Sequence, residues 1–131
     1  MNCARSSLPS GVVSWQRMTS VGVDIVDVDR IRDLHQRYGS RFLDRVFTEL
    51  EIEYSFRSRG NRVFEHLAAR FAAKEAVIKA LGYRVPLRSI EVTNDPSGKP
   101  TIVCDNVEGK IEASLSHTDR LAIAHVLIEG D

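Results

Sequence analysis

The sequence has few cysteines, no long apolar run and no excess of charge of one sign, and each absence excludes a class of protein. Its 131 residues carry 18 basic and 18 acidic side chains, which argues against a nucleic-acid-binding protein. No segment is apolar for long enough to span a membrane. The two cysteines, Cys3 and Cys104, lie far apart and lack the spacing of a metal site. We therefore expect unpaired thiols in a reducing compartment and a cytoplasmic protein.

A glycine-rich loop of the P-loop type is also missing, so nucleoside triphosphates are poor candidates as substrates. Residues 1–18 lack the apolar run of a signal peptide, and we expect them to form a flexible N-terminal extension, with Met18 as an alternative start. The composition, 43% apolar and 27% charged, suits one soluble domain over residues 19–131.

Periodicity and turn residues predict an α+β fold in which an antiparallel sheet packs against one long helix and several short ones. Thr48 and Glu51 have the spacing of a capping box, which predicts a helix start. Turn-forming residues 94–98 predict a hairpin, and the last strand, apolar on both faces, should be central in its sheet. We expect helices over residues 29–38, 41–47, 48–57 and 61–81, and strands over residues 21–28, 89–93, 101–104, 111–116 and 121–128.

Asp24 interrupts the first predicted strand, which is otherwise nearly all apolar and should be buried. Val21, Val23 and Ile25 share one face of this strand, and Asp24 lies on the other. A buried carboxylate is costly unless it is paired or bound to a cation. Asp24 could instead cap the following helix, but Asp27 and Asp29 are better placed for that task. Asp24 is therefore a candidate functional residue.

Glu75 and Lys79 stand four residues apart in the long predicted helix and project from one face, in line with Phe71. The simple interpretation is a solvated ion pair between them. The alternative is a site, because the surrounding alanines leave room for a strand, a metal or a phosphate to approach the helix closely. Those alanines are Ala72, Ala73, Ala76 and Ala80.

Four segments together resemble the holo-acyl-carrier-protein synthases, the small class of 4′-phosphopantetheinyl transferases. Their order and separations are more specific than any one of them alone. They cover most of residues 20–129 and are Gly22–Val26 followed by Arg30 and Ile31, Arg41–Glu49, Arg70–Leu81 with its Lys-Glu-Ala core, and Ser114–Thr118 after Gly98–Pro100.

The resemblance implies the 4′-phosphopantetheinyl transferase fold and an enzyme of fatty acid biosynthesis. Such an enzyme moves phosphopantetheine from coenzyme A to a serine of an apo acyl carrier protein, requires Mg²⁺ and releases adenosine 3′,5′-bisphosphate. Asp24 and Glu75 would be the metal ligands, in keeping with the preference of Mg²⁺ for one or two carboxylates. Lys79 would contact the diphosphate and, with Glu75, take part in catalysis. The base that takes the serine proton could be Glu75 itself or a metal-bound water.

The same resemblance implies further partners. Arg70 and His117 would lie along the coenzyme A site together with Lys79. Arg30, Arg41 and Arg45 would dock an acidic helix of the carrier protein, and the active form would be a homotrimer with sites between subunits. From the residues alone, a lone histidine at a strand end such as His117 is more often structural, and His35, His66 and His125 match no motif and are expected to be structural.

Two departures from the family pattern stand out. Larger relatives carry a third acid two residues after the first, where this chain has Val26. The segment Gly82–Pro86 replaces a Gly-Thr-Gly segment and a longer loop, which puts backbone contacts to coenzyme A there in doubt. Two other functions stay open: a non-catalytic α+β module whose arginines bind a protein partner, and a different magnesium-dependent phosphotransferase.

Overall fold

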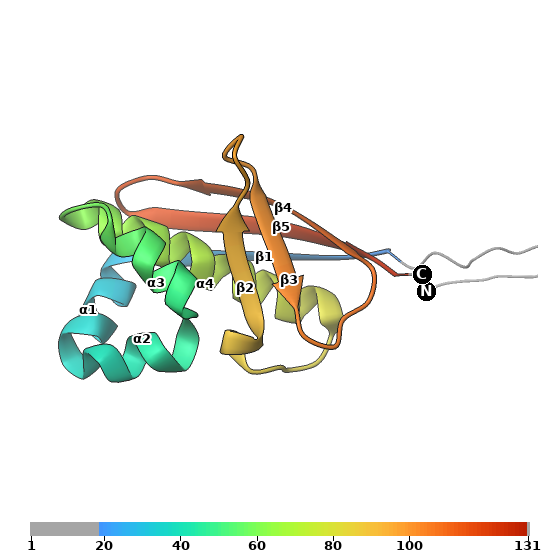
Figure 1. Ribbon diagram of the computed structural model, residues 1–131, viewed down its shortest axis with the longest axis horizontal. Coiled ribbons are helices and arrows are strands. Elements are labelled where there is room, and N and C mark those ends of the chain that lie inside the picture. Colours follow the sequence, from blue (N-terminus) through green and yellow to red (C-terminus); the bar gives the residue numbers. More distant parts are fainter. Residues whose placement is uncertain (1–18, 131) are drawn as a thin grey trace, which may run out of the picture.

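The computed structural model describes residues 19–130, so the predicted extension over residues 1–18 lies outside the described residues. The predicted helices and strands are confirmed with shifts of about one or two residues at their ends (Figure 1). No described helix has the length and apolar character needed to cross a membrane. The elements are β1 (Thr19–Asp27), α1 (Val28–Tyr38), α2 (Ser40–Val46), α3 (Glu49–Phe56), α4 (Asn61–Leu81), the 3₁₀ helix η2 (Leu87–Ser89), β2 (Ile90–Asn94), β3 (Pro100–Cys104), β4 (Lys110–His117) and β5 (Leu121–Glu129).

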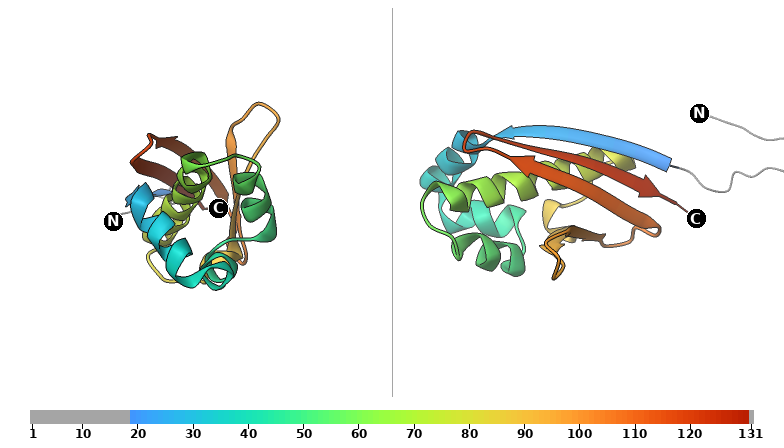
Figure 2. Two further views of the ribbon diagram at one scale, coloured as in Figure 1. Left: turned by 90° about the vertical axis from the view of Figure 1, so that its left-hand side faces the viewer. Right: turned by 90° about the horizontal axis from the view of Figure 1, so that it is seen from above.

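The strands form two antiparallel sheets, one of three strands in the order β1-β5-β4 and one made of the β2-β3 hairpin. The predicted hairpin and the central position of β5 are both confirmed. Helix α4 lies against one face of the three-stranded sheet, and α1, α2 and α3 gather at the end where α4 begins (Figure 2). The long helix is therefore the centre of the fold.

Gly22 brings β1 into backbone contact with α4. A Cβ atom at this position would lie 2.0 Å from the Ala76 carbonyl oxygen and 2.9 Å from the Ala80 nitrogen, distances that no side chain can adopt. The alanines on this face of α4 are fully or almost fully buried. The prediction that small residues let a strand approach the helix is thus confirmed, and this contact places Asp24 beside α4.

The prediction that β1 is buried is wrong for one of its faces. Val21, Val23 and Ile25 are 50–60% exposed, because β1 is an edge strand and the other face of its sheet carries α4. The face that packs on α4 contains Gly22, Asp24 and Val26 instead. Leu121 and Ile123 of β5 are also exposed, and Ile123 pairs with Ile25. The three-stranded sheet thus has an uncovered apolar face, formed by Val21, Val23, Ile25, Leu121 and Ile123.

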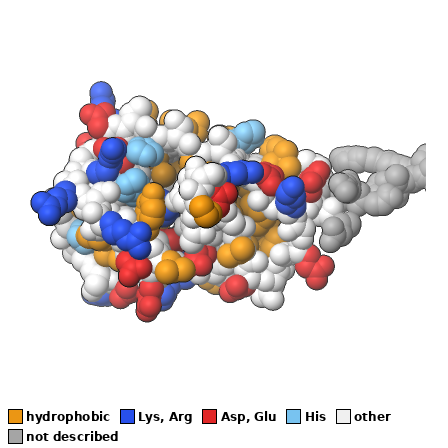
Figure 3. All heavy atoms as spheres, turned by 45° about the horizontal axis from the view of Figure 1, so that its top comes forward, with side chains coloured by type: hydrophobic (Ala, Val, Ile, Leu, Met, Phe, Trp, Pro, Cys, Tyr) orange, Lys and Arg blue, Asp and Glu red, His pale blue; other side chains and the backbone are white. Residues whose placement is uncertain are grey.

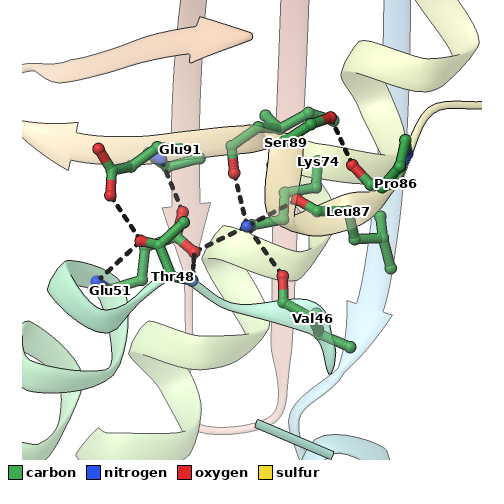
Figure 4. Close-up of polar contacts among 10 residues, drawn as sticks. Val46, Thr48, Glu51, Lys74, Pro86, Leu87, Ser89 and Glu91 are labelled. Atoms are coloured by element: carbon green, nitrogen blue, oxygen red, sulfur yellow. Dashed lines mark hydrogen bonds and ion pairs between the residues drawn. The ribbon is translucent and has the colours of Figure 1, made fainter. Parts of the chain in front are cut away.

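A buried ion pair ties α4 to the rest of the fold. Lys74 and Glu51 are both fully buried, and the Lys74 ammonium lies 2.7 Å from Glu51 Oε1 (Figure 4). Three backbone carbonyl oxygens also accept from this ammonium, at distances of 2.6–3.0 Å. They belong to Val46, Leu87 and Ile90. Burial lowers the pKa of Lys74, and the Glu51 carboxylate opposes that shift.

Glu51 has three roles. It completes the predicted capping box with Thr48, which is confirmed: Thr48 N donates to Glu51 Oε1 over 2.8 Å, and Glu51 N donates to the threonine hydroxyl. Its second oxygen accepts from Val92 N of β2 over 2.7 Å. One carboxylate therefore connects the start of α3, the middle of α4 and the hairpin, and holds the hairpin against the long helix.

Candidate functional site

Asp24 and Glu75 line one cavity of about 280 Å³. Asp24 comes from the face of β1 that packs on α4, and Glu75 comes from α4 itself, so two rigid elements position the two acids. Both side chains are about four-fifths buried. Asp27, Arg30 and Phe71 contribute to the same lining, and we call this space the carboxylate cavity.

Each of the two acids has a basic partner. The Lys79 ammonium lies 3.1 Å from Asp24 Oδ1 and also donates to the Val23 carbonyl over 3.0 Å. Arg84 places its guanidinium 3.3 Å and 3.5 Å from the two oxygens of Glu75. Lys79 thus pairs with Asp24 on the neighbouring strand, and the ion pair between Glu75 and Lys79 that simple helical spacing suggests is not the one that forms.

The residues of the carboxylate cavity fit a Mg²⁺ ion. Mg²⁺ is commonly bound by one or two carboxylates and completes its shell with water and phosphate oxygens. Over residues 19–130, no cluster of three or more His, Cys, Asp or Glu side chains is arranged to hold a metal, in keeping with Val26 at the place of a third acid. The cap interpretation of Asp24 does not apply, because Asp27 occupies the N-cap position of α1 and Asp24 pairs with Lys79.

The three arginines predicted to dock a carrier protein are all exposed. Arg30 lines the carboxylate cavity, at its boundary with α1. Arg41 and Arg45 line a separate cavity of about 420 Å³ between α1 and α2, together with Tyr38 and Phe42. This α1–α2 cavity therefore combines positive charge with an apolar floor.

His117 belongs to a second polar cluster, at the other end of α4. Its Nδ1 lies 3.0 Å from Glu65 Oε1, and Asn61 donates to the other oxygen of Glu65 over 2.8 Å. The ring of His66 lies 5.8 Å from that of His117, and its Nε2 is 3.1 Å from the Ser58 hydroxyl. Figure 3 shows histidine side chains toward the left-hand end of the molecule and another one apart from them, right of centre.

Arg70 is almost completely buried, with 4% of its surface exposed. Its guanidinium donates to Asn94 Oδ1 over 2.7 Å and stacks on the Tyr54 ring at 4.3 Å. Arg70 therefore contacts α3 and β2 and does not line the carboxylate cavity. Its predicted contact with coenzyme A stays a prediction.

A single chain does not bring all the predicted site residues together. Asp24, Glu75, Lys79 and Arg30 lie around the carboxylate cavity, whereas His117 pairs with Glu65. Glu65 and Glu75 are ten positions apart in α4, which corresponds to about 15 Å along the helix axis.

Two basic residues of this region were not identified from the sequence. Lys74 could have been, since it falls among alanines on the buried side of the helix, where a charge needs a partner. No sequence pattern points to Arg84, because its contact with Glu75 depends on the path of the loop after Gly82.

Comparisons of the sequence and of the structure with known proteins agree on one protein family. The profile of the 4′-phosphopantetheinyl transferase superfamily matches residues 20–126. A holo-[acyl-carrier-protein] synthase of Thermodesulfovibrio yellowstonii is 50% identical over 110 residues, which cover 82% of this chain and 96% of that protein. The corresponding enzyme of Latilactobacillus sakei is 41% identical over 115 residues, covering 86% and 97%.

Solved structures agree with the sequence comparisons. A crystal structure of a holo-(acyl-carrier-protein) synthase from Bacillus anthracis, in complex with CoA (3′,5′-ADP), matches with a TM-score of 0.77 and 35% identity, over 86% of this chain and 96% of that one. The Helicobacter pylori enzyme in complex with coenzyme A matches with a TM-score of 0.74 and 28% identity, over 82% and 98%.

Proposed function

Because this chain belongs to the 4′-phosphopantetheinyl transferase superfamily, and within it to the holo-[acyl-carrier-protein] synthases, we propose that it transfers phosphopantetheine from coenzyme A to a carrier-protein serine. The product pair is holo carrier protein and adenosine 3′,5′-bisphosphate. The observation that carries this proposal is the pair Asp24 and Glu75, which face one cavity from β1 and α4. A non-catalytic binding module would not need two acids at such a place.

The side chains of the cavity suit transfer of a phosphoryl-linked group. Asp24 and Glu75 would hold Mg²⁺, which supplies charge compensation for the diphosphate when bound. The serine oxygen forms a bond to the β-phosphorus while the bond from that phosphorus to the bridging oxygen breaks. Lys79 lies beside Asp24 and would donate to the departing phosphate, and Glu75, which lines the cavity, would accept the serine proton.

The carrier protein would dock on α1 and α2. Arg41 and Arg45 line the α1–α2 cavity, and Arg30 connects this surface to the carboxylate cavity. An acidic helix carrying the acceptor serine could thus pair with Arg41 and Arg45 while the serine reaches Glu75. Exposed arginines of this kind accelerate association and select partners by charge.

The active form would be a homotrimer whose sites lie between subunits. Two observations support this. The uncovered apolar face of the β1-β5-β4 sheet offers a surface for a second copy of the chain. In addition, the carboxylate cavity of one chain is too small to enclose coenzyme A and is separated from His117, so a neighbouring subunit could supply His117.

We place the enzyme in the cytoplasm and in fatty acid biosynthesis. Acyl carrier proteins and coenzyme A are the substrates of that setting, and Cys104 is a buried free thiol, as a reducing compartment allows. Burial also raises the pKa of the Cys104 thiol, which keeps it protonated and unreactive.

One experiment tests the proposed function directly. The purified chain is incubated with coenzyme A, Mg²⁺ and an apo acyl carrier protein, and the carrier is analysed by intact mass spectrometry. We expect the mass of one phosphopantetheine group to be added, and no addition when EDTA is present or when the acceptor serine is replaced by alanine. An unmodified carrier under all conditions would favour the binding-module alternative.

A further inference from the structure

Arg84 is the residue of the carboxylate cavity region that has no assigned role. It follows α4 by three residues, in the Gly82–Pro86 segment where this chain departs from the family pattern. Gly82 ends the helix with a left-handed backbone conformation, φ 82°, and its N–H donates to the Ile78 carbonyl over 2.9 Å. This turn carries the chain back along the helix, so that Arg84 reaches Glu75.

The ion pair between Arg84 and Glu75 contributes little free energy, because its distances are long and one partner is exposed. Its two N–O distances are 3.3 Å and 3.5 Å, and the Arg84 side chain is 65% exposed while that of Glu75 is 20% exposed. Solvent screens such a pair, and ordering a long side chain opposes it. By contrast, the Lys74 ammonium lies at 2.7 Å from Glu51 in a fully buried setting. Arg84 can therefore be removed from Glu75 at little cost.

The Arg84 guanidinium and a divalent cation would both bind the carboxylate oxygens of Glu75. The two contacts of Arg84 occupy both oxygens of Glu75, and a metal ion bound directly to that carboxylate needs at least one of them. Two positive groups on one carboxylate also repel each other. Metal binding at Glu75 therefore competes with Arg84 and favours its displacement.

A displaced Arg84 has space to move into, and the proposed substrate would bring a suitable anion close to it. Arg84 lines an open cavity of about 460 Å³ together with Arg45, Val85, Pro86 and Leu87. Because Arg84 also contacts Glu75, this cavity lies next to the carboxylate. A guanidinium binds phosphate oxygens in a planar two-pronged geometry. A diphosphate held beside the metal would thus offer the guanidinium a better partner than the carboxylate it has lost.

We propose that Arg84 is a displaceable counter-ion of Glu75: it occupies the carboxylate in the metal-free enzyme and transfers to the diphosphate of coenzyme A when metal and substrate bind. This inference rests on the proposed function. In the free enzyme, Arg84 is a positioning residue that holds the Glu75 carboxylate. Its move from Glu75 to the diphosphate couples metal binding to coenzyme A binding. Coenzyme A thereby raises the metal affinity, and by thermodynamic reciprocity the metal raises the affinity for coenzyme A.

The test uses Mn²⁺ as the probe and the full chain, stripped of metal. The dissociation constant for Mn²⁺ is measured by electron paramagnetic resonance of the free ion, with and without saturating coenzyme A and without carrier protein. The variants are Arg84→Gln and, as a matched control, Arg88→Gln, which removes an exposed positive charge in the same connection between α4 and β2. Glu75→Gln shows whether the bound ion is at the carboxylate cavity.

Without coenzyme A, we expect Arg84→Gln to bind Mn²⁺ about two- to fivefold more tightly than the wild type, since an exposed ion pair has been removed as competitor. With coenzyme A, this gain should disappear, because the variant has lost a phosphate contact. A defect in folding would weaken binding and so cannot mimic the gain. Wild-type affinity in Arg84→Gln, an equal gain in Arg88→Gln, or a gain that coenzyme A leaves unchanged would each overturn the proposal.

The experiments can reject the role of Arg84 without rejecting the proposed function. If the wild type transfers phosphopantetheine and loses Mn²⁺ binding on Glu75→Gln, but Arg84→Gln shows no gain, only the role of Arg84 is rejected. If the wild type neither binds Mn²⁺ nor modifies the carrier, the proposed function is rejected and the inference falls with it.

Discussion

Lys74 and Glu51 form an ion pair in which neither side chain is accessible to solvent, with 2.7 Å between the ammonium nitrogen and the carboxylate oxygen. Lys74 directly precedes Glu75, so the same turn of α4 carries a structural cation inward and a candidate metal ligand toward the carboxylate cavity. The pair fixes α4 against α3 and the hairpin, and it thereby fixes the helix on which Glu75 stands.

Replacing Lys74 by methionine should destabilise the protein by about 3–5 kcal/mol, because Glu51 would remain buried without its partner. The free energy of unfolding is measured by urea denaturation monitored by circular dichroism. The control is Lys110→Met, which breaks an exposed pair with Glu112 and should change that free energy by less than about 1 kcal/mol. Equal effects of the two substitutions would mean that the buried pair contributes no more than a surface pair.

Asp24→Asn and Glu75→Gln should each fold normally and lower the transfer rate by about 100-fold or more, since a lost metal ligand removes several kcal/mol of transition-state stabilisation. The rate is measured by intact mass of the carrier at limiting Mg²⁺. Glu112→Gln, an exposed substitution on β4, is the matched control and should leave the rate unchanged. Near-normal turnover in either cavity variant would rule that residue out as a metal ligand.

Arg45→Glu should raise the apparent KM for the carrier protein and leave the KM for coenzyme A nearly unchanged. Arg45 is exposed at the α1–α2 cavity, where it would face the acidic helix of the carrier. The difference from the wild type should shrink as salt is added, because exposed charges are screened. Arg88→Glu serves as control. A rise in both KM values would indicate a folding defect instead of a docking role, and no change would indicate a merely solvated basic surface.

Mixing two inactive variants, Glu75→Gln and His117→Ala, should restore activity if the site is shared between subunits. After dissociation and random reassociation at equal concentrations, about one quarter of the interfaces would combine an intact Glu75 with an intact His117 from the neighbour. Activity should therefore recover to about a quarter of the wild-type value, with light scattering used to confirm mixed trimers. Mixed trimers without recovery would place His117 in the site of its own subunit or outside catalysis. A fully active monomer would refute the shared site altogether.

Acidification should destabilise the protein in part through His66. Burial lowers the pKa of His66, and the neighbouring positive charges of Arg70 and His117 lower it further. Between this lowered pKa and the ordinary value near 6.5, the unfolded chain binds more protons than the folded one, so stability falls as the pH falls through that range. The drop in Tm from about pH 7.5 to about pH 5.5 should therefore be smaller in His66→Gln than in the wild type. His125→Gln, at an exposed position of β5, should retain the wild-type drop, and an identical drop in His66→Gln would refute the role of His66.

The elements of this fold could be predicted because their signals are local. The capping box at Thr48, the uninterrupted helix from Asn61 to Leu81 and the turn residues before Gly98 each fix a boundary within a few neighbouring residues. A charge in an apolar strand needs a reason, so the sequence predicts a functional role for Asp24, and the structure gives this carboxylate a partner in Lys79.

What could not be predicted depends on contacts between distant segments. The alternation in β1 does not reveal which face meets α4, since an apolar face can be covered by the protein's own core or by another copy of the chain. The capping box alone explains a glutamate at position 51, so the sequence gives no reason to expect that Glu51 also pairs with Lys74. The contact of Arg84 with Glu75 is set by the course of a short loop, on which helical spacing gives no information.

The backbone contact at Gly22 predicts which residues around the carboxylate cavity can be substituted and which cannot. Because β1 touches α4 without an intervening side chain, the separation of Asp24 and Glu75 is set by two main chains and cannot be adjusted by exchanging neighbouring residues. Arg30, Arg41 and Arg45, which would face the carrier protein, instead carry long and exposed side chains. Laboratory evolution toward a new carrier protein should therefore collect its changes among these arginines and leave the glycine and the alanines beneath it untouched.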